Sequence, residues 1–93
     1  MEETLLTMLK ADLGIRNTTL YDARFRQLLT AAQADIIAEG ASTLDASDPE
    51  DQQLIVMYAA WLWRCRESMD GMPRMLRLKL NNRVFREAAN SHD

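Results

Sequence analysis

Cysteine, glycine and proline are scarce in this chain, and each scarcity reduces the number of fold classes that the chain could adopt. The single cysteine, Cys65, excludes an internal disulfide, so a small scaffold held by disulfides is ruled out. There are only three glycines and two prolines, and no segment shows strand-like alternation of apolar and polar residues. With nearly half of its residues hydrophobic and about a quarter charged, the chain has the composition of an all-α domain.

Long hydrophobic runs are also missing. The longest uncharged run, from Gln52 to Trp63, is about half of the roughly 20 residues that a membrane-spanning helix needs. The N-terminus lacks the basic-then-apolar order of a signal peptide. We therefore expect no membrane contact, and the lone cysteine favours a reducing, intracellular setting.

The charge of the chain is distributed unevenly. Residues 1–50 carry 9 acidic and 4 basic side chains, whereas residues 51–93 carry 5 acidic and 7 basic ones, for a net charge of −3. Halves of opposite sign suit complementary surfaces that meet head to tail in an assembly, or a basic C-terminal patch that contacts nucleic acid. Solvated helix faces without a partner are a third interpretation, and charge alone leaves all three open.

Hydrophobic periodicity predicts two amphipathic helices in the first forty residues. The first runs from about Glu3 to Leu13 and the second, capped by Thr19 or Asp22, reaches about Glu39. Gly14 and Gly40 follow the two helices as natural C-terminal stops. The apolar stripes consist of Leu5, Leu6, Leu9 and Leu13 in the first helix and of Phe25, Leu28, Leu29, Ala32 and Ile36 in the second.

The segment 48–51 predicts the start of a third helix. Asp48 supplies a capping side chain, Pro49 suits the first turn, and two acids face the positive end of the helix dipole. We expect this helix to end around Ser68 to Asp70. Pro73 then enters the first turn of a fourth helix that runs to about Ala89.

The third helix is apolar on every side between Leu54 and Arg66, so it must be surrounded. A single domain that spans residues 1–93 has a radius of gyration of roughly 12 Å and few elements to wrap such a helix. We expect other subunits to supply part of the cover.

The fourth helix has two apolar faces. One stripe contains Leu76, Leu80 and Val84, and the other contains Met75, Leu78 and Phe85. A basic strip of Lys79, Arg83 and Arg86 lies between them. One face should pack on the chain's own core and the other on a neighbouring subunit, which leaves the basic strip for a carboxylate or phosphate; burial of both faces within the chain is the alternative. The sequence thus predicts a small bundle of four helices with an apolar third helix and a two-faced C-terminal helix.

Four segments in this order resemble a known family. They read LLTMLKADLGI, YDARFRQLLTAAQADIIAEG, DQQLIVMYAAWLWRCR and MPRMLRLKLNNRVF. Together they are similar to the small head–tail connector (head completion, adaptor) proteins of tailed bacteriophages and prophages. The segment MPRMLRLKLNNR is closest to a signature and resembles the C-terminal helix of Gram-positive prophage members.

The resemblance implies a structural protein of the virion, assembled in the cytoplasm of the bacterial host. Identical subunits would form a ring between the portal and the tail or a stopper protein, around the channel through which DNA passes, with transient DNA contact. The resemblance places subunit or portal contacts between residues 72 and 85, and we add the adjoining Arg86. The interface candidates are Met72, Arg74, Met75, Arg77, Leu78, Lys79, Arg83, Phe85 and Arg86.

Residues that could support catalysis are few. The one histidine, His92, lies at the terminus. Cys65 lies between two arginines that would lower its pKa, but without a histidine to assist it we expect a small buried hydrophobe. Helix capping accounts for the acids of segment 48–51 without calcium. We therefore expect no enzyme activity, no catalytic residue, no cofactor and no metal.

Two alternative functions belong to other classes. A helix-turn-helix-like DNA-binding module would read bases with Arg74, Arg77, Lys79, Asn81, Asn82, Arg83 and Arg86. The negative net charge and the apolar residues among these positions count against it. A small protein-interaction bundle with a regulatory or scaffolding role is the other alternative.

Overall fold

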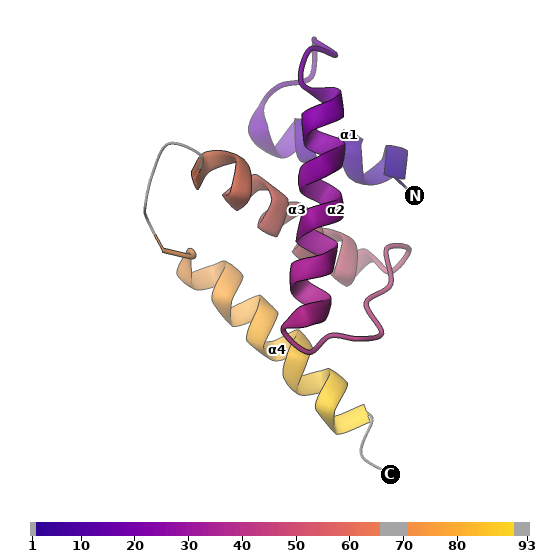
Figure 1. Cartoon of the computed structure of the whole chain (residues 1–93), viewed down its shortest axis with the longest axis vertical. Coiled ribbons are helices and arrows are strands. Elements are labelled where there is room, and N and C mark those ends of the chain that lie inside the picture. The colour runs from indigo at the N-terminus through magenta and orange to yellow at the C-terminus, as the bar shows by residue number, and fades with distance from the viewer. Residues whose placement is uncertain (1, 66–70, 91–93) are drawn as a thin grey trace.

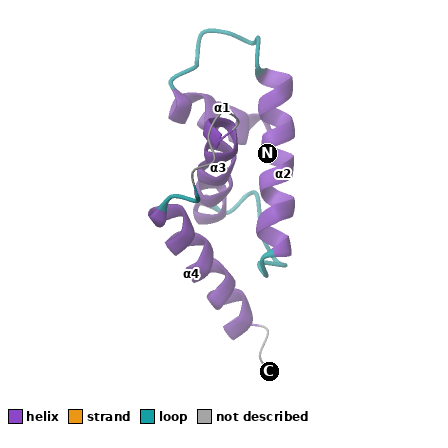
Figure 2. Cartoon of the chain, turned by 60° about the vertical axis from the view of Figure 1, so that its left-hand side comes forward, coloured by secondary structure: helices purple, strands orange, loops and turns teal. Residues whose placement is uncertain are grey.

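The structure, a computed structural model, describes residues 2–65 and 71–90 (Figure 1). Over these residues it contains four helices and no strand (Figure 2): α1 Glu2–Leu13, α2 Asp22–Ala38, α3 Pro49–Arg64 and α4 Arg74–Asn90. The prediction of a small all-α bundle is confirmed.

Helices α1, α2 and α3 pack against one another, whereas α4 packs on α3 and extends beyond the end of α2 (Figures 1 and 2). The chain is therefore elongated, with extents of 47 × 30 × 17 Å. Its radius of gyration of 13.4 Å exceeds the expected value because α4 protrudes from the other three helices.

The apolar stripe of α2 is buried as predicted, and so is that of α1 except for Leu13, which is only partly buried. In α2 the buried positions are Phe25, Leu28, Leu29, Ala32 and Ile36. Gly14 and Gly40 follow α1 and α2 with φ values of +72° and +130°, a region that favours glycine. The expected cap of α2 is wrong, since Tyr21 occupies the N-cap position and makes no side-chain capping bond. Asp22 instead forms an ion pair with Lys10 at 2.9 Å, which joins α2 to α1.

Helix α3 begins as predicted. The Asp48 carboxylate accepts a hydrogen bond from the backbone N–H of Asp51 at 3.1 Å, and Pro49 follows in the first turn. The helix ends at Arg64 with Cys65 as its C-cap, earlier than expected. The segment 66–70, in which we placed the end, lies outside the described residues.

The other three helices all contact α3, so the apolar helix is covered along its middle. The buried positions fill its middle, from Leu54 to Ala60, with only Met57 partly exposed among its apolar residues there. Trp63 packs edge-on against Phe25 of α2, with ring centroids 4.8 Å apart. The last turn is only partly buried, and cover from other subunits stays a prediction.

The end of α2 lies directly against α4. A Cβ atom placed on Gly40 would lie 2.8 Å from Cγ1 of Val84, closer than van der Waals contact allows. Glycine is therefore required here for two reasons, its positive φ and the close approach of α4.

Candidate interaction surface on the C-terminal helix

Helix α4 has the two faces that the sequence predicts. Leu76 and Leu80 are buried in the core and Val84 packs against it. On the other side, three large apolar side chains are exposed to solvent: Met75 by 60%, Leu78 by 51% and Phe85 by 76%. The alternative in which both faces are buried within the chain is wrong.

Of the other interface candidates, Met72 is partly buried and packs against the core. Arg74 is exposed and has no ion-pair partner among the described residues. Arg77 forms an ion pair with Glu39 of the α2 C-cap at 3.5 Å, with both side chains half exposed. Interface roles for these residues stay predictions.

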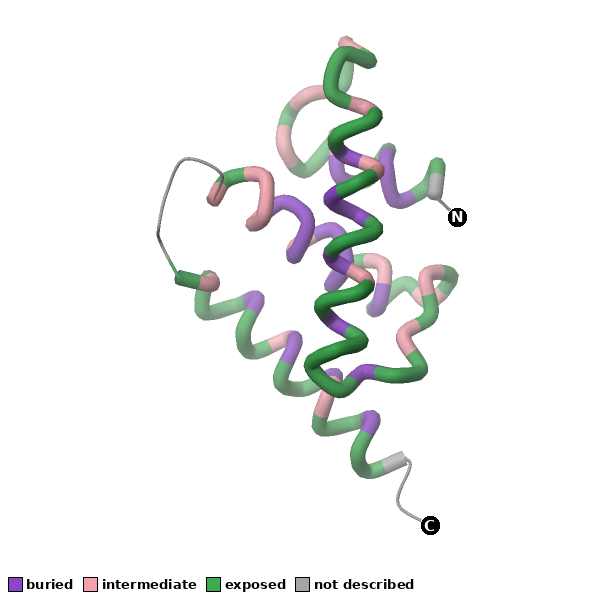
Figure 3. Tube along the Cα trace, in the orientation of Figure 1, coloured by how far each residue is buried: buried purple, intermediate pink, exposed green. Residues whose placement is uncertain are grey.

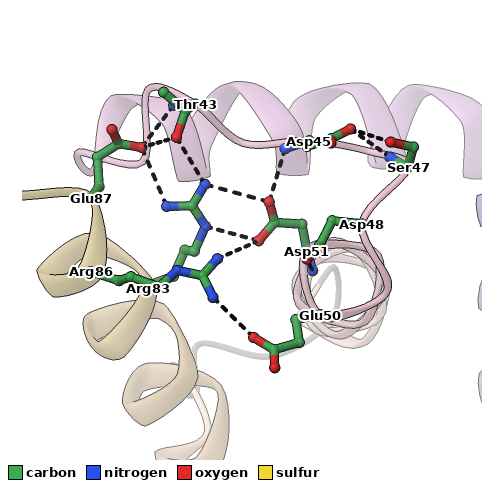
Figure 4. Close-up of polar contacts among 9 residues, drawn as sticks. All are labelled: Thr43, Asp45, Ser47, Asp48, Glu50, Asp51, Arg83, Arg86 and Glu87. Atoms are coloured by element: carbon green, nitrogen blue, oxygen red, sulfur yellow. Dashed lines mark hydrogen bonds and ion pairs between the residues drawn. The ribbon is translucent and has the colours of Figure 1, made fainter. Parts of the chain in front are cut away.

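Arg83 is not available to an outside carboxylate or phosphate, so this expectation is wrong. Its side chain is only 8% exposed, and its Nε donates a hydrogen bond to Asp51 Oδ1 at 2.8 Å (Figure 4). Its Nη1 donates to Glu87 Oε1 at 3.3 Å, one turn along α4, and its Nη2 donates to Thr43 Oγ1 at 3.2 Å. The guanidinium is therefore held by α3, by α4 itself and by the loop between α2 and α3.

The two carboxylates that face Arg83 also bind the α2–α3 loop. Glu87 Oε1 accepts hydrogen bonds from both the backbone N–H of Thr43, at 2.8 Å, and its hydroxyl. Asp51 Oδ2 accepts from the backbone N–H of Asp45 at 2.9 Å. We call the group Thr43, Asp51, Arg83 and Glu87 the Arg83 network. Figure 4 shows that it links α4 to the loop and to the first turn of α3.

Arg83 and Glu87 of the Arg83 network are both charged at neutral pH. The hydrogen bonds from the Thr43 hydroxyl and backbone hold the pKa of Glu87 below its usual value, and Arg83 adds to the effect. The hydrogen bond to Asp51 raises the pKa of Arg83 above its already high ordinary value. Buried charges of this kind are tolerated because each is paired and hydrogen-bonded.

The other two members of the basic strip are also engaged within the chain. Arg86 forms ion pairs with Glu50 at 3.0 Å and with Asp51 at 3.7 Å. Lys79 donates a hydrogen bond to Gln53 at 3.4 Å. These residues line a groove of about 350 Å³ between α3 and α4. Arg83 and Arg86 already pair with acids of α3 there, whereas Lys79 contacts only the neutral side chain of Gln53 among the described residues.

Reasoning from the sequence missed the structural roles of Asp51, Glu87 and Thr43. Asp51 was assigned to the helix dipole, yet only 2% of it is exposed. A signal was present on α4, because Arg83 and Glu87 follow Leu76 and Leu80 on the same helical face at spacings of three and four residues. A charged pair on the core face of a helix requires buried partners of opposite charge.

Other chemistry finds little support in the residues that the structure describes. None of their histidine, cysteine, aspartate or glutamate side chains form a group of three that could hold a metal ion. Cys65 is partly exposed rather than fully buried, contrary to expectation, and His92 lies outside the described residues. None of the four described helices is long and apolar enough to cross a membrane.

Comparisons with protein-family models, with curated proteins and with solved structures find no match to this chain.

Proposed function

We propose that this chain is a structural subunit of an oligomeric ring in a phage particle. The ring joins the head to the tail, between the portal and a tail or stopper protein, and surrounds the DNA passage. The observation that carries the proposal is the second face of α4, where Met75, Leu78 and Phe85 are exposed on a helix that already packs on its own chain. The resemblance of the four sequence segments supplies the phage setting.

Single exposed hydrophobic residues are ordinary on soluble proteins, but a set on one helical face is not. Leu78 lies three residues after Met75 and seven before Phe85, so all three side chains project from the same side of α4. The opposite side holds Leu80 in the core. A helix with one buried face and one exposed apolar face is what we expect in a subunit whose exposed face becomes buried against a neighbour on assembly.

Assembly is favoured over base recognition by one feature of α4. Arg83, which a recognition helix would use, is committed to the Arg83 network. Contact with DNA is therefore transient and non-specific in this proposal.

The decisive experiment mixes the purified protein with a portal ring from the same genome and images the mixture by electron microscopy. The expected result is a cyclic layer of the protein on one end of the portal. A portal ring from an unrelated genome is the matched control and should stay bare. Light scattering of the protein alone, across a range of salt concentrations, tests self-association in parallel.

An absence of portal binding would overturn the proposal. If the protein instead retained duplex DNA with steep salt sensitivity, the nucleic-acid module would replace it.

A further inference from the structure

The exposed face of α4 follows the spacing of a coiled-coil seam. Met75, Leu78, Asn82, Phe85 and Ala89 recur at intervals of three and four residues, and all five are exposed. This heptad spacing keeps one side of a helix against a partner helix along its length. The tube in Figure 3 shows α4 exposed along the side that faces away from the other helices. We call these five residues the α4 seam.

The flanks of the α4 seam are basic. In heptad terms Arg74, Lys79 and Arg86 occupy the positions beside the seam, where charges choose the partner. The helix as a whole contains five basic side chains and one acidic one. Pairing of two α4 helices, parallel or antiparallel, would bring these flanks together. Arg86 is already paired with Glu50 of its own chain, so it is like-charge repulsion among the Arg74 and Lys79 side chains that disfavours a second α4 as the partner.

The outward face of α2 has the complementary character. Ala31, Ala34 and Ala38 are exposed there, on the side opposite the buried stripe, and leave room for large side chains. Between Gln27 and Ala38 the one charged side chain is Asp35, and Glu39 follows at the C-cap. The negative end of the α2 dipole lies at the same end of the helix. Figure 3 shows this side of α2 open to solvent.

We propose that the α4 seam of one copy docks on the outward face of α2 of a second copy. Large side chains at the seam, Leu78 and Phe85 above all, would lie over the alanines of α2. Arg74, which has no ion-pair partner among the described residues, would face Asp35 and Glu39 at the C-terminal end of α2, where Glu39 also pairs with Arg77 of its own chain. This inference deepens the proposed ring function and rests on it, since it names the two surfaces through which neighbouring subunits meet.

The contact is heterologous because the two surfaces belong to different helices of the chain. A heterologous contact leaves one surface of each kind free at the ends of any open chain of subunits. It therefore generates a closed ring when the rotation between neighbours completes a circle, and a filament otherwise. A contact between two copies of one surface would stop at a dimer.

The test uses two variants that each damage one surface. Leu78→Glu disrupts the α4 seam and keeps the α2 face, whereas Ala34→Arg obstructs the α2 face and keeps the seam. Each variant alone should self-associate at least about tenfold more weakly than the wild type. An equimolar mixture should form a one-to-one dimer and nothing larger, because only one intact pair of surfaces remains. Sedimentation equilibrium measures all three samples.

Matched controls make the same chemical changes elsewhere. Leu20→Glu alters a leucine that is 75% exposed in the connection before α2, and Ala11→Arg alters an exposed alanine of α1. Both should self-associate like the wild type. Circular dichroism should show unchanged helical content in all four variants. An Ala34→Arg protein that assembles normally would overturn the inference, as would a Leu78→Glu protein that does so.

Cross-linking tests the same two surfaces if the wild-type protein assembles only on the portal. The triple variant Leu78→Cys, Ala34→Cys, Cys65→Ser is oxidised alone and in the presence of the portal ring. A ladder of covalent oligomers is expected in at least one setting, because facing helices bring such cysteines within bonding distance. No ladder in either setting overturns the inference. If a layer still forms on the portal without a ladder, the proposed ring function stands and only these surfaces are wrong.

Discussion

The Nε atom of Arg83 lies 2.8 Å from Oδ1 of Asp51, and both side chains are almost completely buried. This ion pair joins α4 to the first turn of α3 across 32 residues of sequence. It also fixes which side of α4 faces the core, because Arg83 shares that side with Leu76 and Leu80. The Arg83–Asp51 ion pair therefore also determines that the α4 seam faces solvent.

Replacing Arg83 by glutamate should destabilise the fold rather than only an interface. The change leaves Asp51 and Glu87 facing a third carboxylate, and breaking a buried ion pair costs about 3–5 kcal/mol. Urea denaturation followed by circular dichroism measures the loss. The matched control is Arg74→Glu, an exposed arginine of the same helix, which should change the free energy of unfolding by no more than about 0.5 kcal/mol. Equal stability of the two variants would show that the Arg83 network does not hold α4 in place.

The pH dependence of stability should carry a contribution from Glu87. Its folded pKa is lowered from an ordinary value of 4.5, so its stabilising effect is fully present above that value. As the pH falls through the folded pKa, the carboxylate takes up a proton and loses its charge-assisted bonds, and this stabilisation disappears. The variant Glu87→Gln should be less stable than the wild type at pH 7, with a flatter decline in acid. Parallel stability curves for the two proteins between pH 7 and strong acid would contradict this role.

Local patterns made the first two helices predictable. The buried positions of α2 are those of its apolar stripe, and Gly40 ends it, because periodicity and a positive φ are properties of a short segment. The start of α3 at Asp48 was predictable for the same reason. The two faces of α4 followed from spacing as well, since a helix with a single core cannot bury both of them.

The Arg83 network was not predicted because its partners are brought together only by the tertiary fold. Asp51 and Thr43 lie more than thirty residues from Arg83 in sequence, and no local rule pairs them. Arg83 was placed on a basic strip by its residue type, although its position relative to Leu80 puts it on the core face. Whether a charged residue is buried is thus predicted better by its position on the helix than by its residue type.

Replacing Gly40 by alanine should destabilise the chain through both backbone strain and a collision with Val84. The φ of +130° is unfavourable for any side chain, and the new Cβ would lie 2.8 Å from the Val84 methyl. Gly14 offers a contrast, because its φ is also positive but a Cβ there meets no atom within 4 Å. Adding Val84→Ala should recover part of the loss for Gly40→Ala and none for Gly14→Ala. A double-mutant cycle based on chemical denaturation measures the difference.

Additive effects at Gly40 and Val84 would indicate that α4 does not approach the end of α2 as closely as the structure places it.

The two faces of α4 should respond in opposite ways to the same substitution. Leu80 is fully buried, so Leu80→Asp places an unpaired carboxylate in the core at a cost of several kcal/mol, comparable with the whole stability of a small domain. Leu78, two residues earlier, is 51% exposed, and Leu78→Asp should fold with a free energy of unfolding close to that of the wild type. Circular dichroism and thermal unfolding distinguish the two variants at once. A folded Leu80→Asp protein together with an unfolded Leu78→Asp protein would mean that α4 presents its other side to the core, and the seam proposed for assembly would then be buried.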